Sequence, residues 1–116
     1  MEHAAFLSVK PVGKGLVAKV TCPAVGQRES QVLEQELRAA VGPVKGRAAL
    51  DMSSVTVLGS MGLGVLVTIT KVCKDAGGRL VIFGLSKDLT ELVRLTKLDR
   101  FLSIAASERD ASATLG

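Results

Sequence analysis

The segment from Leu50 to Ala76 constrains the fold more than any other part of this 116-residue chain. It starts at the end of a short apolar run, passes through a loop at residues 53–59 and enters a helix at or just after Ser60. Its apolar residues recur at i, i+3, i+4 and i+7 over four turns, which predicts a helix with one wide buried stripe. The stripe consists of Gly62, Val65, Leu66, Ile69, Val72, Cys73 and Ala76.

Two apolar segments flank this helix and are predicted to be parallel strands that lie side by side. Residues 48–52 precede it, and residues 79–83 follow it after a pair of glycines at 77–78 that suits a left-handed helix cap. Because both segments are apolar almost throughout, we expect each strand to be covered on both faces. A strand, a helix and a strand with short links form a right-handed crossover.

The remaining segments complete a single small α/β domain over residues 1–116. Its predicted order is β-β-α-β-α-β-α-β-α, with a mixed central sheet and about four helices. The other expected elements are a hairpin of strands at 6–9 and 16–20, a loop at 21–26, a helix at 28–41, a third helix capped by Ser86, an edge strand at 101–105 and a short terminal helix after Ser107 that frays.

Composition excludes several classes of protein. An apolar content of 47% is enough for a core, and the formal net charge of +4 comes from scattered basic residues. The absence of Trp and Tyr leaves no aromatic platform for bases, so we do not expect a nucleic-acid partner. No apolar run is long enough for membrane insertion, and residues 1–5 do not form a secretory signal. Two cysteines make no disulfide framework, which favours the reducing cytoplasm.

The chain offers no set of residues typical of catalysis or metal binding. Its only histidine is His3, so no nucleophile–histidine arrangement is available. The glycines at 59, 62 and 64 are in the wrong order for a dinucleotide fingerprint. Asp51 lacks a neighbouring carboxylate and is interpreted as a strand-end residue that binds loop amides. We therefore predict a non-enzymatic protein with no catalytic residues, cofactor or metal.

Ser60 is the polar residue that this pattern singles out. The first amides of a helix have no intrahelical acceptor and carry partial positive charge. A hydroxyl there can cap the helix, and a phosphate there would be stabilised by the same amides. Both interpretations of Ser60 remain open from the residues alone.

The run LDMSSVTVLGSMGLGVL, from Leu50 to Leu66, resembles the signature of the STAS family of bacterial anti-sigma factor antagonists and their relatives. The later runs GGRLVI and LTKLDRF resemble the downstream half of that family, so the resemblance extends from Ala48 to Ala106. It is poor before Ala48, because family members carry Gly-Glu-Leu-Asp where this chain has TCPAVG.

The resemblance implies regulation by partner switching. An antagonist of this kind binds a serine-kinase anti-sigma factor with a histidine-kinase-like ATPase fold and so frees a sigma factor. The kinase phosphorylates the serine that begins the central helix, and a phosphatase reverses the reaction. Ser60 aligns with that phosphoacceptor. Two neighbours depart from the family pattern, because Gly59 replaces an aspartate and Met61 replaces a small hydroxyl residue.

A partner-binding surface is predicted around Ser60. It comprises Gly59, Met61, Gly62, Leu63 and Val67. Leu63 and Val67 are i, i+4 neighbours on the side of the helix opposite the stripe, and we expect the helix after Ser86 to cover them only partly. Met61 suits either an exposed contact or the core.

Two alternatives stay open beside the switched antagonist. Gly59 and Met61 favour an unphosphorylated STAS subunit, either of a larger assembly or of a lipid-transporter ATPase complex. A small nucleotide-binding protein that uses the loop from Gly59 to Gly64 is the third hypothesis. A second copy of the chain, as a homodimer, is a further candidate partner.

Overall fold

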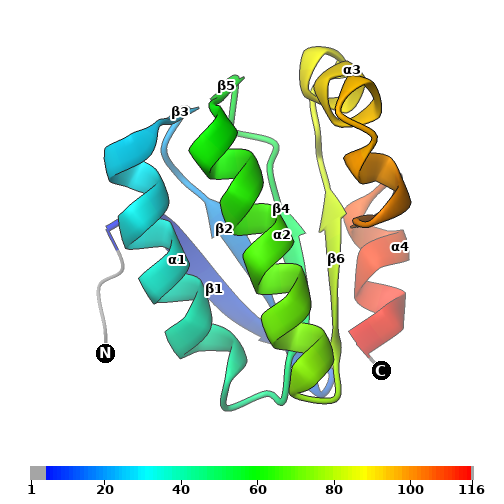
Figure 1. Ribbon diagram of the computed structural model, residues 1–116. Coiled ribbons are helices and arrows are strands. Elements are labelled where there is room, and N and C mark those ends of the chain that lie inside the picture. The colour runs from blue at the N-terminus through cyan, green and yellow to red at the C-terminus, as the bar shows by residue number, and fades with distance from the viewer. Residues whose placement is uncertain (1–4, 116) are drawn as a thin grey trace.

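The computed structural model describes residues 5–115 and builds them around a five-stranded mixed sheet (Figure 1). The strand order is β1-β2-β4-β6-β7, in which β1 is antiparallel to β2 and the remaining pairs are parallel. The strands are β1 (Leu7–Val12), β2 (Gly15–Val20), β4 (Arg47–Asp51), β6 (Arg79–Phe83) and β7 (Ser103–Ile104). The predicted α/β class, the mixed sheet and the hairpin are confirmed.

Within residues 5–115, four α-helices accompany the sheet, as predicted. They are α1 (Gln27–Val41), α2 (Ser60–Asp75), α3 (Lys87–Leu95) and α4 (Glu108–Ser112), with the short 3-10 turns η1 (Leu98–Arg100) and η2 (Ala113–Leu115). Figure 1 shows α1 and α2 side by side on one face of the sheet. The hydroxyl of Ser86 accepts a hydrogen bond from the Leu89 amide at 3.1 Å, so this serine caps α3 as expected.

The central strands explain why α2 needs its apolar stripe. Strand β4 lies between β2 and β6, with Leu50 opposite Ile82 in the parallel register. Both side chains are fully buried, together with Ile69 and Cys73 of α2. Helix α2 and its two flanking strands therefore form the predicted crossover, and they share one apolar core.

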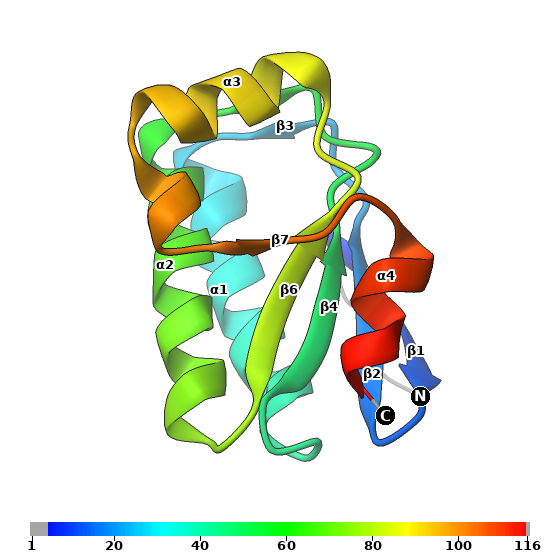
Figure 2. The ribbon, with the colours of Figure 1, turned by 90° about the vertical axis from the view of Figure 1, so that its right-hand side faces the viewer.

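The second face of the sheet is covered by the terminal helix, which the sequence predicted to fray. Instead, Ala111 of α4 and Leu115 of η2 are buried in a cluster with residues of the sheet. Figure 2 shows α4 beside the sheet, on the side away from α1 and α2. They pack on Val17, Ala49, Val81 and Phe83. The backbone amide of Lys14 also donates to the Leu115 carbonyl at 3.1 Å. The prediction of fraying was wrong because it rested on the short length of the helix alone. The apolar residues on this face of the sheet must be shielded from water, and the terminal helix covers them.

A second small sheet lies where only loops were predicted. Strand β3 (Ala24–Val25) pairs in parallel with β5 (Val57–Leu58). The Pro23 carbonyl accepts hydrogen bonds from the amides of Thr56 at 2.8 Å and Val57 at 3.1 Å. Strands of two residues are too short to show periodicity, so neither strand was predicted. Their pairing fixes the segment from which α2 begins.

Among residues 5–115, no helix has the length and apolar character needed to cross a membrane.

Candidate partner-docking site

Ser60 is exposed at the first residue of α2. The N-cap position is occupied by Gly59, whose backbone is extended at φ −79° and ψ 175°, and no side chain caps this end of the helix. The interpretation of Ser60 as a helix cap is therefore wrong, because a capping hydroxyl belongs one residue earlier. The Ser60 side chain is left free for another role.

The beginning of α2 is electrostatically suited to an anionic group. The first intrahelical bond runs from the Leu63 amide to the Gly59 carbonyl at 3.0 Å. The amides before it have no partner within the helix and carry the positive end of its dipole. The first turn contains no acidic residue that would neutralise this charge.

Two exposed apolar side chains lie within three residues of Ser60 in the sequence. Val57 of β5 is 59% exposed, and Met61 of α2 is 45% exposed. The structure thus decides between the two interpretations of Met61 in favour of an exposed position. We call Val57, Ser60 and Met61 the α2 entry surface. It combines a hydroxyl with apolar side chains of the kind that interaction sites use.

The prediction that Leu63 is only partly covered is wrong. This side chain is only 9% exposed and belongs to the same core cluster as Leu89 and Val93 of α3, while Val67 is half-buried. Figure 2 shows α3 lying across the end of the molecule where α2 begins. Because α3 supplies further apolar side chains at that end, the buried face of α2 is wider there than its stripe suggested.

Gly62 is also buried, and its role is packing. A Cβ atom at this position would lie 2.5 Å from Cδ1 of Leu58 and 3.1 Å from Cγ1 of Val25. Glycine thus lets α2 approach the small β3–β5 sheet closely. Gly59 is half-buried and donates its amide to the Val25 carbonyl at 3.0 Å. Of the predicted partner-binding residues with a side chain beyond hydrogen, Met61 is therefore the most exposed.

The candidate catalytic and metal-binding residues are placed as follows. Asp51 Oδ1 accepts a hydrogen bond from the Ser53 amide at 2.9 Å, which confirms its predicted structural role. Within residues 5–115, no group of three or more His, Cys, Asp or Glu side chains could hold a metal ion. His3 lies outside the described residues. Burial raises the pKa of the Cys73 thiol to about 11, so this thiol stays protonated at neutral pH.

Comparison with known proteins identifies the family. The family model of the STAS domain matches residues 27–111, which is most of the chain. The chain therefore belongs to the STAS domain family.

Solved structures show the same fold. A putative anti-sigma factor antagonist from Thermotoga maritima superposes with a TM-score of 0.82 at 19% identity, over 97% of this chain and 96% of that one. The unphosphorylated anti-sigma factor antagonist SpoIIAA gives 0.71 at 13% identity, over 90% and 91%. SpoIIAA from Bacillus has also been solved in a phosphorylated form. The murine anion transporter Slc26a9 gives 0.74 at 16% identity, over 90% of this chain but 18% of that one.

Proposed function

We propose that this protein is an anti-sigma factor antagonist that acts by binding its partner and is switched by phosphorylation of Ser60. The observation that carries the proposal is the exposed Ser60 hydroxyl at the first position of α2, flanked by exposed Val57 and Met61. The family assignment supports it, as does the structural similarity to the Thermotoga protein and to SpoIIAA, which are anti-sigma factor antagonists or putative ones. The protein works as a binding module in the cytoplasm and not as an enzyme.

The partner is a serine-kinase anti-sigma factor with an ATPase fold, and a phosphatase restores the binding form. In this scheme the partner covers the α2 entry surface while Ser60 is unmodified. Phosphorylation adds about −1.5 to −2 charges at that surface. The free amides of α2 stabilise the phosphate on the antagonist itself. Desolvation of the same charge opposes docking, so the modification releases the partner without unfolding the domain.

The first experiment compares Ser60→Asp and Ser60→Ala in titrations against the serine-kinase anti-sigma factor proposed as the partner. Ser60→Ala should bind as wild type, because Ser60 is not a cap and an exposed substitution changes stability by only about 0.5 kcal/mol or less. Ser60→Asp should weaken binding by roughly tenfold or more, a loss on the order of 1.4 kcal/mol. Its melting temperature should not fall, since a carboxylate suits the positive helix end.

A matched control places the same charge elsewhere. Ser8 is exposed on β1, so Ser8→Asp should leave binding unchanged. Mass spectrometry after incubation with the kinase and ATP should find phosphate on Ser60. The switch hypothesis fails if Ser60 stays unmodified and Ser60→Asp binds as tightly as wild type.

A second candidate function is an unphosphorylated STAS subunit of a larger assembly or of a lipid-transporter ATPase complex. Gly59 and Met61, which depart from the family pattern beside the phosphoacceptor, favour it. So does the match to Slc26a9, in which a domain of this fold makes up a small part of a transporter. Co-purification with transporter subunits, and with no kinase, would establish this function in place of the switch.

A further inference from the structure

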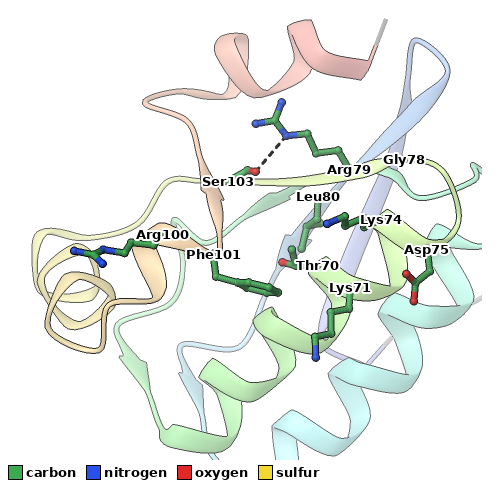
Figure 3. A pocket seen from close by; sticks show the side chains of 10 residues that line it. All are labelled: Thr70, Lys71, Lys74, Asp75, Gly78, Arg79, Leu80, Arg100, Phe101 and Ser103. Atoms are coloured by element: carbon green, nitrogen blue, oxygen red, sulfur yellow. Dashed lines mark hydrogen bonds between the residues drawn. The ribbon is translucent and has the colours of Figure 1, made fainter.

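A groove of about 680 Å³ opens near the end of α2 that lies farthest from Ser60 (Figure 3). The last two turns of α2 form one wall, and the start of β6 and the segment from η1 to β7 form the others. An α-helix rises 1.5 Å per residue, so Lys71 in this wall lies roughly 16 Å along the axis from Ser60. The groove and the α2 entry surface are therefore separate sites.

Basic residues outnumber acidic residues in the lining of the groove. Its basic lining residues are Lys71, Lys74, Arg79 and Arg100, and its one acidic lining residue is Asp75. Four positive charges against one negative leave a surplus of three, in a chain whose formal net charge is +4. The ion pairs found in residues 5–115 use other basic side chains, so none of these four is neutralised by a carboxylate within 4 Å.

The arrangement of these charges indicates the kind of ligand. Figure 3 shows the Arg100 guanidinium pointing outward from η1, while Arg79 extends from β6, where its Nε donates to the Ser103 hydroxyl at 3.2 Å. The basic groups thus surround the groove and do not converge on one point, as donors to a single phosphate do. Several spaced carboxylates on an extended chain match this distribution better.

Phe101 adds an apolar side chain among the basic residues that line the groove. Its ring points toward Thr70 and Lys71 of α2, and the residue is 43% exposed. An exposed aromatic side chain with basic neighbours can bind an apolar residue while the carboxylates beside it pair with the basic groups. The sequence did not reveal this site, because its residues come from four separate elements.

We propose that this groove binds an acidic segment of a partner protein, with one apolar side chain placed against Phe101. The site operates independently of Ser60, so both surfaces can be occupied at once. It would give the protein a second contact, whose strength depends on salt and not on phosphorylation.

The test uses a synthetic fluorescent peptide of Asp and Glu residues with one central Leu, measured by anisotropy at low ionic strength. Lys74→Glu and Arg100→Glu should each weaken binding by roughly 5- to 30-fold, because each reverses a charge close to the peptide. Phe101→Ala should weaken it by about fivefold or more. The control Lys14→Glu, in the turn between β1 and β2, should change binding by less than about twofold.

Milder variants guard against misfolding. If a charge reversal lowers the melting temperature, Lys71→Gln and Lys74→Gln replace it and should each still weaken binding by about threefold. Equal losses in Lys14→Glu and Lys74→Glu would overturn the proposal, because binding would then follow net charge alone. Displacement of the peptide by ATP or inorganic phosphate at matched ionic strength would show a small-anion site instead. Binding to phosphatidylserine vesicles, but not to the peptide, would show a lipid surface.

Discussion

At the level of single residues, a shift of one or two positions along a helix changes whether a side chain is bonded, buried or exposed. Ser60 lies one residue beyond the cap, so its hydroxyl is exposed and free, whereas Ser86 lies at the cap and bonds the helix amide. Met61 and Leu63 are two residues apart on α2, and the first is exposed while the second is buried. Both pairs show that the residues of the α2 entry surface are defined by their position in the helix and not by residue type alone.

The burial of Leu63 leads to a direct test. Leu63→Ala should lower the free energy of unfolding by roughly 2–5 kcal/mol, as should Leu66→Ala, because truncating a buried leucine leaves a cavity. Both residues are buried in α2. The exposed control Met61→Ala should cost less than about 1 kcal/mol. Urea denaturation measures all three, and a Leu63→Ala loss as small as that of Met61→Ala would restore the predicted open face.

At the level of elements, the entry to α2 is built by segments that are far apart in sequence. The Pro23 carbonyl binds the amides of Thr56 and Val57, and the Gly59 amide binds the Val25 carbonyl. These bonds position the small β3–β5 sheet against the first turn of α2. Glycine suits that contact at position 62, because a Cβ atom there would lie 2.5 Å from Cδ1 of Leu58. The phosphoacceptor candidate thus follows a segment that backbone hydrogen bonds hold to residues 23–25.

Two glycines of α2 test this packing as a matched pair. Gly64 is exposed, and a Cβ atom there would have nothing within 4 Å, so Gly64→Ala should raise stability by about 0.5–1 kcal/mol through helix propensity. Gly62→Ala should not show this gain, because Leu58 must move to admit the methyl group. Thermal or urea unfolding compares the two variants, and equal gains would contradict the close approach of α2 to β3 and β5.

At the level of the whole molecule, the sheet is covered on both faces although most helical residues lie on one. Helices α1 and α2 cover the larger core, and α4 with η2 covers the smaller cluster on the other face. The Lys10 and Glu108 side chains form an ion pair at 2.8 Å beside this smaller cluster. Both groups are substantially exposed, so the pair contributes little, and the buried apolar residues hold the terminal helix in place.

The terminal segment therefore has a measurable role in stability. Leu115→Ala should lower the free energy of unfolding by roughly 2–5 kcal/mol, because this side chain is buried against the sheet. Ala113→Ser, at an exposed position two residues earlier, should change it by less than about 0.5 kcal/mol. Urea denaturation with both variants separates the alternatives, and a neutral Leu115→Ala would mean that the segment frays as the sequence predicted.

Local periodicity determined much of this protein. The spacing of apolar residues defined α1 and α2, the continuous apolar runs defined β4 and β6, and Ser86 and Ser107 marked the starts of α3 and α4. Each of these features depends on residues within a few turns of one another. The resemblance to the STAS family came from residues 48–106, and the family model, which matches residues 27–111, confirmed it.

Contacts between distant segments were decided only by the tertiary structure. The pairing of β3 with β5, the covering of Leu63 at the α3 end and the burial of Leu115 all join residues remote in sequence. The groove around Phe101 likewise exists only when α2, β6, η1 and β7 meet. A chain's periodicity shows which face of an element is apolar, but the partner that covers this face depends on the packing of the whole domain.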